Sequence, residues 1–120
     1  MGKILDWVEG KRRRPALRFD GHYNQKAEIV RDLRELSFER VQTVFHDPYA
    51  YFLPARTEKG ERRWFAFGET HDNLIAVVLF TLKGSGEQER IRVVTAWKAG
   101  RDVRDYYTEQ RRFDRGSDKT

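Results

Sequence analysis

The sequence predicts an α+β domain in which two N-terminal helices pack on a mainly antiparallel four-stranded sheet that is followed by a short C-terminal helix. Three observations support this fold class. Apolar residues recur every three or four positions up to Phe45, β-prone stretches separated by short turns run from Tyr49 to Trp97, and helical spacing returns after Gly100. With 120 residues, the chain is expected to form one domain around one core. We place that domain at residues 17–112, between a basic extension at 1–16 and a flexible tail at 113–120.

The two predicted helices differ in how clearly their ends are marked. The apolar face of the first consists of Tyr23, Ala27, Val30, Leu33 and Leu36. Ser37 is positioned to cap the second, and Asp47 with Pro48 ends it. The apolar stripe of this second helix consists of Phe38, Val41, Val44 and Phe45.

Four stretches rich in aromatic and β-branched residues predict the strands: YAYFL at 49–53, RRWFAFGE at 62–69, NLIAVVLFTL at 73–82 and ERIRVVTAW at 89–97. The turn sequences between them, such as EKGE, HDN and KGSGEQ, are too short for crossover helices. The sheet is therefore expected to be antiparallel, with the helices on one of its faces and the other face free for function.

Composition excludes several classes of protein. The chain has no cysteine, so it has neither disulfides nor a thiol nucleophile. Asp6 and Glu9 interrupt the apolar N-terminal residues, and the longest apolar run, at 74–80, is too short to span a bilayer. We therefore expect a cytoplasmic protein with no membrane partner. The basic run KRRR at 11–14 is interpreted as a solvated tail, with phosphate contact as the alternative.

The charge balance favours a polyanionic partner. The 24 Lys and Arg residues exceed the 19 Asp and Glu residues, which gives a formal net charge of +5. Such an excess suits nucleic acid or an acidic protein. His22, His46 and His71 are too far apart in sequence to indicate a metal site, so we expect turn or surface histidines, no metal and no cofactor.

Strand alternation predicts a basic surface. In the last strand Arg90 and Arg92 share a face with Val94, Ala96 and Lys98, because side chains alternate with period two. In the strand after EKGE, Arg63 shares a face with Phe65 and Phe67, and Glu61 lies in line with it. Pairing of the strands would bring Arg63 and Arg92 to one surface with Glu61 at its edge.

A surface of this kind has two interpretations. Guanidinium groups can neutralise a phosphate while a carboxylate or phenolate removes the proton of an RNA 2′-hydroxyl, which is what cleavage without a metal requires. The alternative is an ordinary polar sheet face stabilised by Arg and Glu pairs across strands.

Three motifs carry a resemblance to a known family: SFERVQTVFHDP at 37–48, GERRWFAFG at 60–68 and IRVVTAWKAGRDVRDYY at 91–107. The chain resembles the BrnT family of type II toxins over about residues 17–109. The resemblance implies a RelE-like ribonuclease fold, RNA cleavage or inhibition of translation, and neutralisation by a ribbon-helix-helix antitoxin, BrnA. It also implies that toxin and antitoxin together repress their operon, so that operator DNA is contacted only through the antitoxin.

By matching motifs, the resemblance gives a set of candidate site residues. The candidate catalytic residues are Glu61, Arg63, Arg92, Lys98 and Tyr107. The candidate RNA-binding residues are Arg90, Trp97, Arg101 and Arg104. Structural roles remain open for Lys98, as a cation at a helix start, and for Tyr107, as an amphipathic core residue.

The sequence departs from the family pattern at two places. Trp97 stands where the S-A-R-K-A motif has arginine, and LREL at 33–36 replaces a lysine-histidine-glycine turn. Trp97 suits stacking on a base, or packing in a core or interface. Two functions therefore stay open: an endoribonuclease toxin acting on free or ribosome-bound RNA, and a non-catalytic module that binds an antitoxin or nucleic acid.

Overall fold

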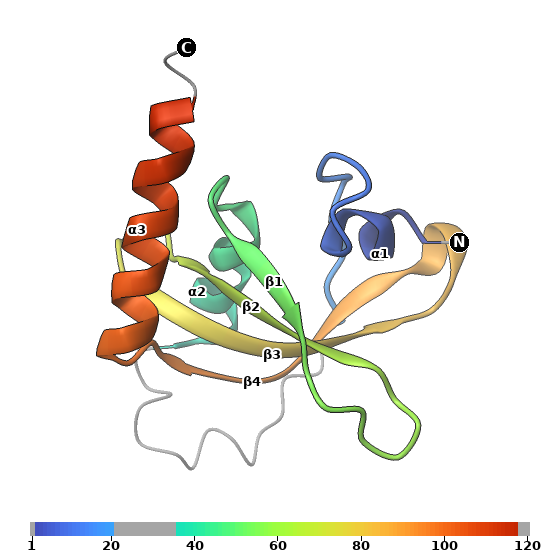
Figure 1. Ribbon diagram of the computed structural model, residues 1–120. Helices are drawn as coiled ribbons and strands as arrows, with labels where there is room; N and C mark the ends of the chain where they lie inside the picture. Colours follow the sequence, from blue (N-terminus) through green and yellow to red (C-terminus); the bar gives the residue numbers. More distant parts are fainter. Residues whose placement is uncertain (1, 21–35, 118–120) are drawn as a thin grey trace.

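The computed structural model describes residues 2–20 and 36–117 (Figure 1). Its elements in chain order are α1 (Lys3–Val8), α2 (Phe38–Gln42), the 3₁₀ helix η3 (Thr43–His46), β1 (Tyr51–Pro54), β2 (Arg63–Glu69), β3 (Ile75–Lys83), the 3₁₀ helix η4 (Gly86–Gln88), β4 (Arg90–Lys98) and α3 (Arg101–Ser117). The first predicted helix lies outside the described residues except for Leu36, which is buried in the core. None of the described helices combines the length and hydropathy needed to cross a membrane.

The four strands form one antiparallel meander in the order β1-β2-β3-β4, as predicted. Helices α1 and α2 lie over the same face of this sheet (Figure 1). We call it the helix face and the opposite one the outer face. The second predicted helix is confirmed as α2 continued by η3, and Ser37 Oγ accepts a hydrogen bond of 3.2 Å from the backbone nitrogen of Arg40.

Aromatic rings fill the centre of the helix face. Phe45 of η3 meets Phe80 of β3 edge-on at 5.1 Å between ring centroids, and Phe19 at 5.5 Å. Trp64 of β2 stacks on the same Phe80 ring at 6.0 Å. This core fixes the sheet against η3. Because successive side chains of a strand alternate between the two faces, the residues between the core positions must point to the outer face.

The N-terminal helix α1 belongs to this core, although the sequence predicts an extension over residues 1–16. Ile4 is 3% exposed and packs with Val8 in the main apolar cluster. The buried Glu89 accepts hydrogen bonds from the backbone nitrogens of Ile4 at 2.6 Å and Leu5 at 3.3 Å. These bonds satisfy N–H groups that a helix start leaves without intrahelical partners.

A bulge in β4 changes which side chains share a face. Phe80 pairs with Val93 but Leu79 pairs with Thr95, so one residue, Val94, is extra in β4. Beyond the bulge, Ala96 and Lys98 lie on the helix face, whereas Trp97 lies on the outer face. The predicted grouping of Lys98 with Arg90 and Arg92 is therefore wrong, because simple alternation does not hold through position 94.

The C-terminal helix is longer than the short helix predicted. Helix α3 has 17 residues and packs against one end of the sheet, where Val103 contacts the outer-face cluster of Phe67, Val77 and Ala99. Tyr107, one turn further along, is 1% exposed. Helix α3 therefore covers one end of the outer face.

We expect Ile4→Ala to lower the free energy of unfolding by about 2 to 5 kcal/mol, because it leaves a cavity in the core. Lys3→Ala, an exposed neighbour in the same helix, is the matched control and should change it by no more than about 0.5 kcal/mol. Urea denaturation followed by tryptophan fluorescence measures both. Equal stability of the two variants would show that α1 does not contribute to the core.

Candidate functional site

The strand register gathers four cations at the end of the outer face away from α3. Arg63 pairs with Thr81, and Thr81 pairs with Arg92, so these three residues form one row across β2, β3 and β4. Lys83 and Arg90 pair in the adjacent part of the β3–β4 ladder and point the same way. We call Arg63, Lys83, Arg90 and Arg92 the basic end.

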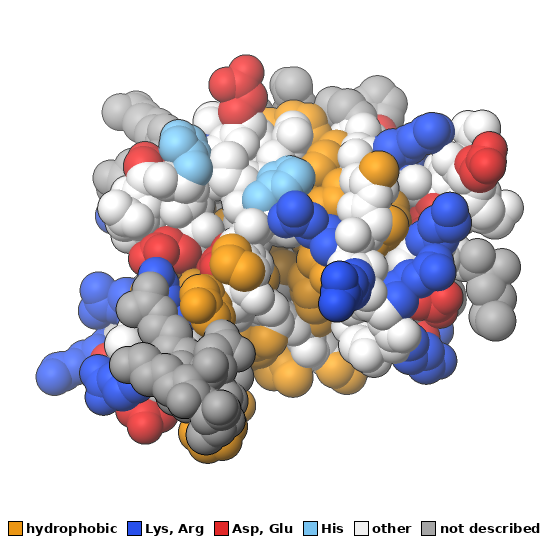
Figure 2. Space-filling view, turned by 90° about the horizontal axis from the view of Figure 1, so that it is seen from above, with side chains coloured by type: hydrophobic (Ala, Val, Ile, Leu, Met, Phe, Trp, Pro, Cys, Tyr) orange, Lys and Arg blue, Asp and Glu red, His pale blue; other side chains and the backbone are white. Residues whose placement is uncertain are grey.

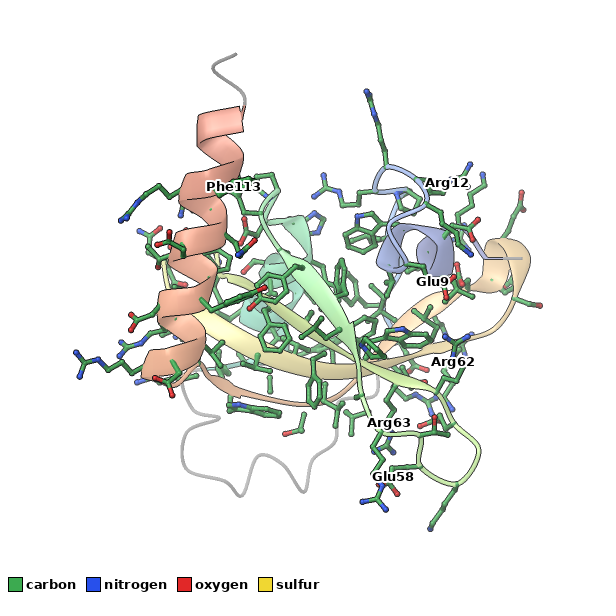
Figure 3. The ribbon with its side chains drawn as sticks, in the orientation of Figure 1. Glu9, Arg12, Glu58, Arg62, Arg63 and Phe113 are labelled. Carbon is green, nitrogen blue, oxygen red and sulfur yellow. The ribbon has the colours of Figure 1, made fainter. Side chains whose placement is uncertain are left out.

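Figure 3 shows how alternation separates neighbouring arginines on β2 and the loop before it. Arg62 extends toward α1, where its Nη2 lies 3.5 Å from Glu9 Oε2. Arg63 extends to the opposite side, near Glu58 (Figure 3). Only Arg63 therefore contributes to the outer face.

Two carboxylates hold the basic end in place. Glu61 contacts Arg63 Nε at 3.3 Å and Lys83 Nζ at 2.5 Å. Asp20 Oδ2 accepts from Arg92 Nε at 3.1 Å and Nη2 at 2.7 Å, and contacts Arg90 Nε at 3.3 Å. Among the described residues, the four cations of the basic end outnumber the two carboxylates that pair with them, and these ion pairs restrict the positions of the cations.

The pairing affects the protonation of Glu61. The hydrogen bond from Lys83, followed by that from Arg63, holds the pKa of Glu61 below its usual range. Glu61 is therefore an ionised acceptor at neutral pH. While it keeps both cations as partners it is a weaker base than an ordinary carboxylate.

Beside the basic end, five aromatic residues form what we call the aromatic zone: Tyr51, Phe65, Phe67, Trp97 and Tyr106. Successive ring centroids lie 6.2 Å apart from Trp97 to Phe65, 6.0 Å from Phe65 to Phe67, 4.7 Å from Phe67 to Tyr51 and 5.5 Å from Tyr51 to Tyr106. Trp97 is 38% exposed and Tyr106 is 54% exposed, so both ends of the zone reach solvent. Burial, with Tyr106 nearby, raises the pKa of Tyr51 to about 12, so its phenol is neutral at pH 7.

The structure separates the other candidate residues from the basic end. Arg101 and Arg104 are exposed at the start of α3, at the other end of the sheet, and Lys98 lies on the helix face. Tyr107 is turned inward, where its hydroxyl donates a hydrogen bond to Asp47. Burial, followed by that hydrogen bond, raises the pKa of Tyr107, which favours its packing role over the role of proton carrier.

A family model described as "Ribonuclease toxin, BrnT, of type II toxin-antitoxin system" matches residues 23–102. The chain belongs to the BrnT family. Comparison with individual curated proteins gives no match. The BrnT match contains Glu61 and all four cations of the basic end, whereas α1 and Tyr107 lie outside it. As a type II toxin of the BrnT family, the protein has a cognate antitoxin as its partner.

Sequence reasoning missed a second polar region of this BrnT chain, around Asp47. A cleft of about 410 Å³ lies between the end of η3, the start of the turn after β2, and α3. Arg111 contacts Glu69 at 3.0 Å and lies 5.2 Å from the centre of the Tyr49 ring. Desolvation, followed by the charge of Arg14, lowers the pKa of His46 at the cleft. The only sequence signal for this region is the HDP motif, because Arg111 is distant in the chain.

No group of three or more histidine, aspartate or glutamate side chains among the described residues is arranged to hold a metal ion. The cleft does contain His46 and His71. Of these, His71 is held at η3: its backbone nitrogen donates to Thr43 Oγ1 at 3.0 Å, and its ring Nδ1 lies 3.5 Å from the same oxygen. The cleft is therefore a structural junction, and the basic end with the aromatic zone is the candidate functional site.

We expect Tyr107→Phe to lower the free energy of unfolding by about 1.5 to 3 kcal/mol, because it removes a hydrogen bond to a charged group while keeping the ring. RNA binding by the folded variant should match that of the wild type. Urea denaturation and fluorescence anisotropy with labelled RNA measure the two quantities. An unchanged stability together with lost RNA cleavage would instead assign Tyr107 a catalytic role.

The same phenol predicts a pH dependence. Because the pKa of Tyr107 is raised on folding, its stabilising effect is complete below the ordinary tyrosine pKa of about 10 and is lost as the pH rises above that value. The wild type should therefore lose stability between pH 9 and 11 more steeply than Tyr107→Phe, as measured by thermal unfolding at each pH. Tyr51, whose pKa is also raised on folding, accounts for the loss of stability with rising pH that remains in the variant. Parallel curves would contradict the assignment.

Proposed function

We propose that this BrnT protein is an endoribonuclease that binds single-stranded RNA on its outer face, cleaves it without a metal ion at the basic end and thereby inhibits translation in the cytoplasm. One observation carries the proposal. The register brings Arg63 and Arg92 into one row across three strands, with Glu61 in contact with Arg63.

The dimensions of the row suit a phosphodiester. Two strand spacings separate Arg63 from Arg92, which is about 10 Å between backbones, and their long side chains can converge over Thr81. Guanidinium groups bind phosphate oxygens in pairs and keep their charge at all physiological pH values. A phosphate above Thr81 would therefore meet positive charge on both sides.

The aromatic zone supplies a surface for the bases that flank such a phosphate. Stacking on aromatic rings contributes about 1 to 3 kcal/mol per base and tolerates any base. Trp97 replaces the family arginine, but the β4 bulge turns it to the outer face, where it is exposed beside Phe65. The substitution thus exchanges a cation for a stacking surface, which supports retained RNA binding.

In the reaction assigned to the basic end, the RNA phosphate first competes with Glu61 for the cations Arg63 and Lys83. An incoming phosphate draws Arg63 and Lys83 away from Glu61, and the pKa of Glu61 then rises toward its ordinary value. Glu61 accepts the proton of the 2′-hydroxyl, the 2′-oxygen forms a bond to phosphorus, and the bond from phosphorus to the 5′-oxygen breaks. The 5′-oxygen takes a proton from the Lys83 ammonium group, and the products are a 2′,3′-cyclic phosphate and a 5′-hydroxyl.

The alternative is a non-catalytic module, and one observation favours it. Glu61 and Asp20 already bind the cations of the basic end, as acidic side chains of a partner protein would. A ribbon-helix-helix antitoxin of the BrnA type with an acidic segment would fit this surface and exclude RNA from it. Operator DNA would then be contacted through the antitoxin alone. The two functions share one surface and differ in whether RNA is cleaved.

The first test is incubation of the purified protein with a defined RNA in EDTA and, separately, in a translating extract. We expect fragments that end in 2′,3′-cyclic phosphate, and we expect Arg63→Gln to abolish them. Arg112→Gln removes the same charge from an exposed site on α3 and serves as the control. Intact RNA and normal translation with a folded protein would favour the binding module.

Glu61→Gln separates binding from cleavage. Removal of the carboxylate releases Arg63 and Lys83, so RNA affinity should rise, whereas cleavage should fall by about 10² to 10⁴ because the proton acceptor is lost. Binding is measured by anisotropy and cleavage under single-turnover conditions. Cleavage at the wild-type rate would exclude Glu61 as the base.

A further inference from the structure

The N-terminal segment forms a basic cavity that the proposed function does not use. The cavity has a volume of about 690 Å³ and lies between α1, the chain that follows it, and η4. Four of the lining residues are cations: Lys3, Arg12, Arg13 and Arg18. Figure 2 shows Lys and Arg side chains gathered on the side of the molecule where α1 and η4 lie. We call this the N-terminal cavity.

The carboxylates of the N-terminal cavity do not balance these cations. Glu87 and Glu89 line it, but the carboxylate of Glu89 is buried and accepts hydrogen bonds from the start of α1. Arg12, Arg13 and Arg18 are all exposed. A ligand that enters the cavity therefore meets arginine side chains at its rim and a net positive charge.

A short segment of backbone connects the cavity to the basic end of the outer face. The chain at 18–20 runs beside β4, with Ile91 N donating to Arg18 O and Asp20 N donating to Ile91 O, each at 2.8 Å. Phe19 turns into the core, so Arg18 and Asp20 point the other way, and Asp20 holds Arg90 and Arg92. Arg18 thus joins the cations of the cavity to those of the basic end around the edge of β4.

The turn that precedes Arg90 forms part of the wall of the cavity. Arg90 Nη1 donates to Gln88 O at 3.3 Å, and the neighbouring residues Glu87 and Glu89 line the cavity. The cations therefore follow a track from Arg63 across β3 and β4 to Arg12. The far half of that track, residues 3–18, lies outside the part of the chain that matches the family model.

We infer that the N-terminal cavity is a second subsite for the RNA backbone, which binds phosphates of the same strand that lies on the outer face. The inference rests on the proposed function. RNA is favoured over an acidic peptide because Arg18 lines the cavity next to Asp20, which holds the arginines of the basic end, so one RNA strand bound at the basic end can reach the cavity with further phosphates. The subsite adds affinity for long RNA and takes no part in the bond cleavage.

The test compares RNA lengths and matched charge variants in the full chain. The double variant Arg12→Gln/Arg13→Gln removes two cations of the cavity. The double variant Arg56→Gln/Arg112→Gln removes two exposed cations elsewhere. Labelled RNAs of about 4 and about 16 nucleotides, the range that single-strand-binding domains occupy, are titrated by anisotropy in EDTA between 0.05 and 0.3 M salt.

We expect the cavity variant to bind the long RNA about 25-fold more weakly at 0.1 M salt, with the slope of log K against log salt smaller by about 1.4. These values follow from about 0.7 per phosphate contact on a single strand, for two lost contacts. Affinity for the short RNA and the cleavage rate at saturating RNA should match the wild type, and the control variant should behave as the wild type.

Two results would overturn the inference: an unchanged affinity of the cavity variant for the long RNA, or an equal loss of affinity in the control variant. Failure of the proposed function is recognised separately, because the wild type itself would then bind RNA of neither length or bind it without cleavage.

Discussion

The arrangement of the sheet and helices depends on the carboxylate of Asp47. It accepts hydrogen bonds from the backbone nitrogens of Tyr49 at 2.9 Å and Glu69 at 2.7 Å, and from the hydroxyl of Tyr107. One side chain therefore ties the end of η3 to the end of β2 and to the middle of α3. Because α3 covers one end of the outer face, this junction also determines where the aromatic zone begins. Hydrogen bonds to a partly buried charge are strong individually, and the loss of the shared acceptor would leave several donors without a partner.

The sequence predicts the features that local chemistry determines. The four strands, their antiparallel order and the Ser37 cap follow from side-chain types and short turns, and the placement of Arg63 and Arg92 on one face follows from period-two alternation, whereas their common row depends on the strand register. The sequence fails where a partner is distant in the chain. Helix α1 depends on Glu89, 85 residues from Ile4, and the packing role of Tyr107 depends on Asp47, 60 residues away. Neither contact can be inferred from a motif, so the sequence predicts an extension over residues 1–16 and leaves the role of Tyr107 open.

The candidate site results from two separate requirements of one sheet. The helix face must be apolar to bury Phe45 and Phe80, and alternation then leaves the intervening positions free to carry charge and exposed rings. The carboxylates of Glu61 and Asp20 each bridge two cations and restrict their positions before a ligand arrives. Such preorganisation lowers the cost of binding, because fewer side-chain rotamers have to be restricted afterwards. It also means that any ligand must replace existing ion pairs, which favours a polyanion over a neutral molecule.

The extra residue in β4 has a consequence for how related chains diverge. The pairs on both sides of position 94 are in register, so a chain that lacks Val94 would alternate regularly and would still present Trp97 on the outer face and Lys98 on the helix face. A chain that keeps Val94 but pairs it in the ladder would instead shift the following residues by one position, turn Trp97 to the helix face and bring Lys98 to the outer face. Two chains with the same letters at TAWKA can therefore present different side chains to their ligands, and an alignment of this strand is informative only when the bulge is placed correctly.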